Sequence, residues 1–179
     1  VAAATGQYAD LSILWRMFGA CLSAQATNEA LAVAAGHGHI ECVAFLLPHS
    51  DPNADRGRAL RLAVENQHND CIDLLLPLSD LSDTGFALLW SIVDQHNCAL
   101  LARVAPHCAP SDLDKALLRA CVLGSADLVA QLLGYGADAK KDNSLALRTA
   151  AHNGHLECVD LLFGVSEPHE ALRFLQEQI

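Results

Sequence analysis

The chain has 179 residues, of which 52% are hydrophobic and 18% charged, a composition too apolar for intrinsic disorder. Eleven Lys and Arg residues stand against 21 Asp and Glu, so the formal net charge is −10. This acidic balance argues against binding to nucleic-acid phosphates or to anionic membrane surfaces. The sequence also has no apolar run of about 18 residues, the length that a transmembrane helix requires. We therefore expect neither a nucleic-acid nor a membrane partner.

The seven cysteines are odd in number and spread along the chain, without a close CxxC pair. This pattern is unlike a disulfide framework and is typical of free thiols in a reducing, intracellular compartment. The chain begins at Val1 without a basic segment followed by an apolar stretch, so no signal peptide is recognised. Its abrupt start leads us to expect a piece of a longer protein.

An internal repeat is the most informative pattern in the sequence. An Ala-Leu pair recurs at Ala30, Ala59, Ala87, Ala116 and Ala146, at spacings of 29, 28, 29 and 30 residues. The pattern predicts, in chain order, a partial repeat at 1–27, full repeats at 28–56, 57–84, 85–113, 114–143 and 144–168, and a terminal half repeat at 169–179. We expect these segments to form one domain.

Each repeat is predicted to hold two short helices. The first runs from the Ala-Leu pair to the Gly or Gln before a His, and the second carries apolar residues at helical spacing, as at Ile40, Val43 and Leu47. Pro or Gly follows each second helix, for example at Pro48, Pro77 and Gly134. Two such helices cannot bury their apolar faces alone, so the repeats must stack. The sequence predicts an all-α solenoid of helix-turn-helix units.

These repeats resemble the ankyrin repeat, whose pattern is TPLHxAAxxGHxxxVxxLLxxGAD. Residues 145–163, LALRTAAHNGHLECVDLLF, match it closely, and LLGYGADAKKDN from Leu132 matches the helix end and hairpin start. The TPLH tetrad is replaced throughout by EALA, RALR, FALL, KALL or LALR, so the first helix must begin differently. Most repeats lack three to five residues of the family's hairpin. We therefore expect short, irregular hairpin loops and little β-structure.

The repeat that begins near Phe86 departs most from the pattern, because Val104-Ala105-Pro106 replaces its expected Leu-Leu ending. We expect the stack to bend there or a partner to dock there. Trp90 lies in the first helix of this repeat, where other repeats have Val33, Leu62 or Thr149. Two interpretations stay open for it, an exposed aromatic anchor for a partner or a plug of the core, and the second is favoured.

Three His/Cys pairs have a spacing that suits zinc ligation on one helix face. They are His39 and Cys42, His68 and Cys71, and His155 and Cys158. All three occupy the same repeat positions, about 10 Å apart in a helix stack, which is too far for a shared ion. The resemblance implies a structural hydrogen bond for each His near the turn between helices, and each Cys is predicted to fill the core. We expect no metal site.

Evidence for catalysis is weak. Cys98 lies two residues from His96 and Cys108 follows His107, but neither pair belongs to a recognisable nucleophile signature. The loop carboxylates Asp51, Asp55, Asp80, Asp83, Asp112 and Asp142 lack the ligand spacing of an EF-hand and are predicted to be turn and helix-cap residues. No phosphate-binding glycine motif is present. We expect this chain not to be an enzyme and to hold no cofactor.

The resemblance implies that a partner binds the concave face, built from the hairpin loops and the first helices. Carried onto that frame, the candidate residues are Arg58, Arg61, Glu65, Trp90, Asp94, Lys115, Arg119, Arg148 and His152. Five of the eleven basic residues would gather there, which predicts a partner surface with acidic side chains. The alternative is that these cations are solvated or pair with Glu65 and Asp94.

The predicted function is capture of a partner or substrate protein by a monomeric ankyrin domain that belongs to a larger protein. The shortened, Ala- and Leu-rich repeats are also similar to the C-terminal ankyrin domains of secreted bacterial effectors. One such group, the type III effectors that modify host arginines with ADP-ribose derivatives, implies a host partner such as a caspase and delivery into host cytoplasm. The alternative is an intramolecular regulatory or scaffolding domain without an external substrate.

Overall fold

The structure is a computed structural model that describes residues 2–18, 21–82 and 84–165. All regular secondary structure in these ranges is helical and contains no strand, which confirms the predicted all-α class. The chain divides into two compact blocks, residues 1–84 and residues 85–179, which we call the N-terminal and C-terminal blocks. Their boundary coincides with a predicted repeat boundary, while the single-domain organisation stays a prediction. The predicted half repeat 169–179 and the loop residue Asp83 lie outside the described residues.

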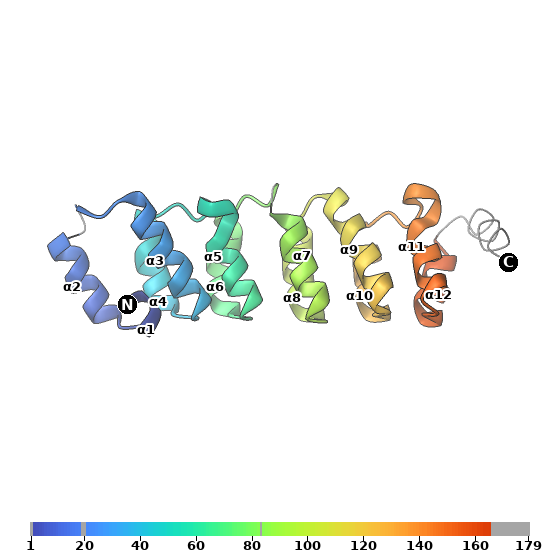
Figure 1. The fold of residues 1–179 in the computed structure, drawn as a ribbon, viewed down its shortest axis with the longest axis horizontal. Coiled ribbons are helices and arrows are strands. Elements are labelled where there is room, and N and C mark those ends of the chain that lie inside the picture. Colours follow the sequence, from blue (N-terminus) through green and yellow to red (C-terminus); the bar gives the residue numbers. More distant parts are fainter. Residues whose placement is uncertain (1, 19–20, 83, 166–179) are drawn as a thin grey trace. The chain divides into compact units, whose positions relative to one another are not determined.

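In the N-terminal block, successive helix pairs stack side by side (Figure 1). Its helices are α1 (Ala2–Thr5), α2 (Tyr8–Phe18), α3 (Ala24–Gly36), α4 (Ile40–Leu46), α5 (Ala54–Glu65) and α6 (Asn69–Leu75), with 3-10 turns η2 (Leu47–His49) and η3 (Leu76–Leu78). First helices pack on first helices, α1 on α3 and α3 on α5, and second helices pack on second helices, α2 on α4 and α4 on α6.

The C-terminal block repeats this arrangement with three pairs (Figure 1). Its elements are α7 (Gly85–Asp94), α8 (Cys98–Val104), η4 (Ala105–His107), α9 (Pro110–Leu123), α10 (Ala126–Gly134), α11 (Lys141–His152) and α12 (Leu156–Phe163). The first helices α7, α9 and α11 pack in sequence, as do the second helices α8, α10 and α12.

The core is built from the repeat positions that stay constant. The leucines of the Ala-Leu pairs, Leu31, Leu60, Leu88, Leu117 and Leu147, are all at most 3% exposed. The alanines three places after four of these leucines, Ala34, Ala63, Ala120 and Ala150, are fully buried. A small side chain lets neighbouring helices approach closely, so this constant spacing of Ala and Leu specifies the stacking.

Most first helices begin earlier than the sequence predicts, because local caps extend them. The Ser23 hydroxyl oxygen accepts a hydrogen bond from the Ala26 N–H at 3.2 Å, so α3 begins at Ala24. Pro110 occupies the first turn of α9, where its missing N–H costs nothing. These caps replace the Thr-Pro start that the repeats lack.

The start of α5 is irregular in a different way. Asp55, Arg56 and Gly57 have left-handed backbone angles, with φ of 50°, 57° and 61°, so the right-handed helix begins at Arg58. Asp142 and Ser144 at the start of α11 likewise have positive φ. These turns take the place of the missing hairpin residues, as the short repeats led us to expect.

The loops that precede first helices are tied to the helix before them. Asn28 accepts a hydrogen bond from the Asp51 N–H at 2.8 Å, and Asp114 accepts one from the Asp138 N–H at 2.8 Å. Asp51 and Asp138 in turn accept from the N–H two residues on. Asp51 and Asp138 are therefore turn residues, and for Asp51 this confirms the interpretation of the loop carboxylates.

Candidate functional site

Three histidines in the turns between helices each connect a repeat to the one before it. His39, His68 and His155 each hydrogen-bond through Nε2 to a carbonyl oxygen of the preceding repeat, on Ala4, Gly36 and Val122, at 2.9 to 3.1 Å. The predicted structural hydrogen bond is thus present, and it links adjacent repeats. Because each imidazole bonds to a backbone carbonyl of the preceding repeat, these histidines connect adjacent helix pairs.

The cysteines of the three His/Cys pairs fill the core, as predicted. Cys42, Cys71 and Cys158 are at most 1% exposed, and burial raises the pKa of each thiol, with a further rise from an adjacent carboxylate. A raised pKa disfavours the thiolate, which is the form that binds zinc or attacks an electrophile. Within the described ranges no group of three His, Cys, Asp or Glu residues has a geometry that could hold a metal ion.

A polar cleft of about 280 Å³ lies at the turns of the C-terminal block, lined by His96, Cys98, Ser125 and Glu157 among others. Ser125 Oγ and His96 Nδ1 share a hydrogen bond of 2.5 Å. Nucleophilic catalysis needs a third group that orients the base. In the described part of the chain no carboxylate accepts a hydrogen bond from His96, and the Ser125–His96 contact joins the turns of two adjacent repeats.

The N-terminal block holds three predicted site residues, all on α5. Arg58 Nη1 is 2.5 Å from Glu29 Oε2 on α3, so this cation pairs with Glu29 rather than with Glu65. Arg61 is half-buried, and its Nε atom lacks a hydrogen-bond partner. Glu65 is exposed at the end of the helix. The outward row of α5 is therefore charged along its length.

The C-terminal block brings four predicted residues together on α7 and α9. Arg119 Nε is 2.7 Å from Asp94 Oδ1, and the Arg119 guanidinium lies over the Trp90 ring, 4.6 Å from its centroid. Lys115 Nζ is 3.2 Å from Asp112 Oδ1. Trp90 is 39% exposed, so the favoured interpretation of a core plug is wrong. Its position in α7 faces the neighbouring first helix rather than the core.

The same surface holds Phe86, Leu118 and Val122, which occupy groove positions in the predicted frame but were not among the nine candidate residues. Lys115 Nζ lies 5.1 Å from the centroid of the Phe86 ring, and Phe86 meets Trp90 edge to face. Leu118 is half-buried and Val122 is 43% exposed. Residues three and four apart share a helix face, so Lys115, Leu118 and Val122 form one row of α9. We call Phe86, Trp90, Asp94, Lys115, Leu118, Arg119 and Val122 the α7–α9 face.

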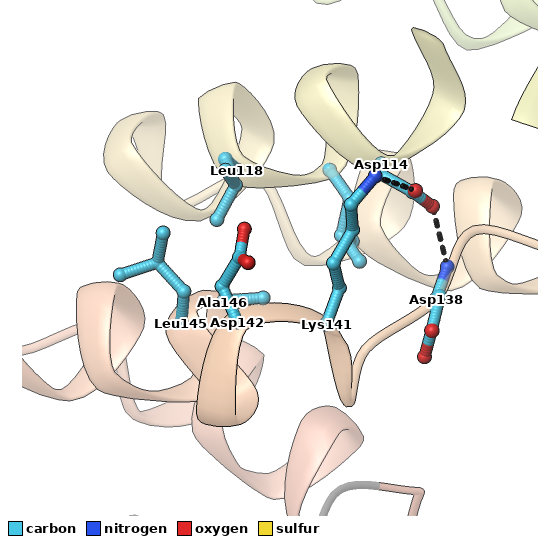
Figure 2. A pocket seen from close by; sticks show the side chains of 8 residues that line it. Asp114, Leu118, Asp138, Lys141, Asp142, Leu145 and Ala146 are labelled. Carbon is cyan, nitrogen blue, oxygen red and sulfur yellow. Dashed lines mark hydrogen bonds and ion pairs between the residues drawn. The ribbon is translucent and has the colours of Figure 1, made fainter. Parts of the chain in front are cut away.

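The remaining predicted residues, Arg148 and His152, lie on the next first helix, α11. Arg148 is half-buried and His152 is exposed. Between α9 and α11 lies a small crevice lined by Leu118, Leu145 and Lys141 among others (Figure 2). Lys141 Nζ is 2.7 Å from Asp114 Oδ2, and this hydrogen bond raises the pKa of Lys141. The residues of this ion pair are part of the lining of the crevice.

Comparison with known families identifies the repeats of the N-terminal block. Residues 1–84 match the family model for ankyrin repeats, described as three copies. No curated protein matches the chain. Together with the all-helical structure, the match supports the predicted ankyrin-repeat fold. Ankyrin repeats generally mediate protein–protein interaction and have no catalytic centre of their own.

None of the helices in the described ranges is both long and apolar enough to span a lipid bilayer.

Proposed function

We propose that this chain, whose residues 1–84 carry ankyrin repeats, is a protein-binding module that captures another protein on its first helices. One observation carries the proposal: buried repeat positions are constant while outward positions change in chemistry. The outward row of α5 is Arg58, Arg61 and Glu65, whereas the equivalent row of α9 is Lys115, Leu118 and Val122. Repeat proteins that bind other proteins typically combine a constant core with a binding surface that varies between repeats.

The nine predicted residues remain our candidates for that surface. Three of the five cations already have carboxylate partners, Arg58 with Glu29, Lys115 with Asp112 and Arg119 with Asp94. The Arg58–Glu29 pair is exposed on both sides and contributes little to stability, so it can rearrange toward a partner at low cost. Arg61 and Arg148 are the other two cations of this set. A finer proposal, that the chain is the capture domain of a secreted bacterial effector acting on a host caspase, is supported by the resemblance of its repeats.

The direct test is affinity capture from eukaryotic cell lysate with the chain as bait, read by mass spectrometry. The comparison bait carries Arg61→Glu and Arg148→Glu on the first helices. A control bait carries Ala44→Glu and Ala130→Glu, which add negative charge at exposed positions of the second helices α4 and α10. A protein retained by the wild-type and control baits and lost from the first variant is the expected result.

The opposite result has a defined meaning. If no protein is enriched above the beads, or if the control changes abolish capture as fully as the first-helix changes, the proposed capture surface is refuted. The intramolecular alternative would then gain support, and it predicts that the chain binds another segment of its own longer protein.

A further inference from the structure

We infer that the α7–α9 face binds a short extended segment of the partner, which places a large apolar side chain on Trp90 and Val122 and a carboxylate at Lys115. The inference rests on the proposed function and names the site and the kind of ligand within it. It concerns the C-terminal block alone.

Two aromatic rings on α7 lie beside two cations on α9, one cation to each ring. Phe86 and Trp90 are four residues apart on α7, with ring centroids 5.3 Å apart at 73°. Lys115 and Arg119 are four residues apart on α9, and each cation lies over one ring, Lys115 over Phe86 and Arg119 over Trp90. Cation–π contacts of this kind are attractive and directional. The rings and cations therefore hold each other in place before any ligand arrives.

The Arg119 side chain is held twice, by Trp90 and by Asp94, and is only 28% exposed. Its rotamer entropy is already lost in the free protein, so a ligand that packs here does not have to order it. Because its charge is matched by Asp94, Arg119 contributes a rigid planar surface rather than an unpaired charge. This preorganisation favours binding at the neighbouring Trp90.

The outward positions of this face are apolar where those of the N-terminal block are charged. Val122 is 43% exposed and Trp90 is 39% exposed. The residue equivalent to Val122 on α5 is Glu65, and the residue equivalent to Leu118 is Arg61. Burial of an apolar side chain against Trp90 and Val122 removes both from water, whereas the same side chain on α5 would meet charged groups.

Lys115 determines where a carboxylate of the ligand belongs. The Lys115 side chain is 54% exposed while its partner Asp112 is only 8% exposed, so solvent meets the ammonium rather than the carboxylate. At the other end of the face, Asp94 is 38% exposed and repels a second acid. The charges of this face thus favour an acidic ligand residue at the Lys115 end alone.

The helix geometry sets the spacing within the ligand. Lys115 and Val122 are seven residues apart on α9, which corresponds to about 10 Å along the helix axis. An extended peptide advances about 3.3 Å per residue. The acidic residue and the apolar anchor of the ligand should therefore be about three residues apart.

The experiment is selection of a displayed random dodecapeptide library on the whole chain, followed by fluorescence polarisation with the synthesised peptides. We expect selected peptides to carry Asp or Glu about three residues from Trp, Phe or Leu. Trp90→Ala and Val122→Glu should each weaken binding by about 30-fold, the range of interface anchors. Ala130→Glu, at an exposed position of the second helix α10, should change the dissociation constant by less than about twofold. Circular dichroism verifies that each variant is folded.

Charge exchange isolates the role of Lys115. Lys115→Glu should weaken binding by about tenfold, the scale of a charged hydrogen bond, and a peptide whose acid is changed to Lys should regain it. Peptides that keep their affinity for the Trp90→Ala and Val122→Glu variants but lose it for Arg61→Glu on α5 would overturn the inference while sustaining the proposed function. The inference would also be overturned if the library selection enriched no peptide although the lysate capture succeeded. Failure of both experiments would refute the proposed function itself.

Discussion

The imidazole of His68 lies against Gly38 so closely that a Cβ atom on Gly38 would be 2.6 Å from the ring Nδ1. The same relationship joins Gly6 with His39 and Gly124 with His155. Where the turn glycine is replaced, as by Gln67 and His96, the corresponding residue of the next repeat is Asn97 or Ser125 rather than His. A turn glycine is thus paired with a His in the next repeat, and a larger turn residue with a smaller side chain there.

The first prediction concerns the stability of this contact. Gly38→Ala places a side chain at φ 75° and into the His68 ring, so we expect the free energy of unfolding to fall by about 2 to 3 kcal/mol. Gly154→Ala is the matched control, because Gly154 has the same φ of 75° but no atom within 4 Å of an added Cβ. Its cost should be near 1 kcal/mol, from backbone strain alone. Urea denaturation measures both, and equal losses would contradict the steric role of His68.

The second prediction tests whether the two residues are coupled. His68→Ser reproduces the small residue found at Ser125 and removes the ring that the new methyl group would strike. In a double-mutant cycle, Gly38→Ala should therefore cost about 1 kcal/mol less in the His68→Ser background than in the wild type. Additive losses in urea denaturation would show that the imidazole does not exclude a side chain at position 38.

The third prediction concerns the loop anchored by Asp114 (Figure 2). Asp114→Ala leaves the Asp138 N–H without its acceptor and should cost about 1 kcal/mol of unfolding free energy. Asp114→Asn retains an acceptor oxygen, as Asn28 does for Asp51, and should be close to wild type although the Lys141 ion pair is lost. Urea denaturation distinguishes the two, and a loss for Asp114→Asn as large as that for Asp114→Ala would make the ion pair the dominant contact.

The fourth prediction is a pH dependence of stability. Burial, with a further contribution from the charge of Asp112, raises the pKa of Cys108 from 9.0 to about 12. Between these values the unfolded thiol loses its proton and the folded thiol keeps it, so stability falls as pH rises above 9. Cys108→Ser keeps a donor for the Val104 carbonyl, as Ser50 and Ser79 do for their helices, but cannot ionise in this range.

Urea denaturation at pH 8.0 and at pH 10.5 provides the measurement. Wild type should lose about 1 to 2 kcal/mol more than Cys108→Ser over this interval, since each unit of pKa shift corresponds to about 1.4 kcal/mol. Equal losses in the two proteins would show that Cys108 ionises as readily in the folded state as in the unfolded state.

The sequence by itself determined the repeat period, the pairing of short helices and most of the core. It could do so because small and apolar residues recur at constant positions, and a helix stack admits one way to bury them. The backbone role of His39, His68 and His155 and the burial of the adjacent cysteines followed from the same regularity. Helix starts did not follow, because Ser23 and Pro110 act as local caps outside the repeating pattern.

Only the tertiary structure decided the chemistry of the candidate surface. Arg58 pairs with Glu29 and Arg119 with Asp94, across 29 and 25 residues of sequence, and these choices depend on side-chain direction between neighbouring helices. Periodicity assigns a residue to a row but not to a partner in the next row. Trp90 was therefore expected in the core, whereas the packing of α7 on α9 places it under Arg119 and partly in solvent. The physical reason is that burial is repeated along the chain, while charge pairing is settled locally between two adjacent helices.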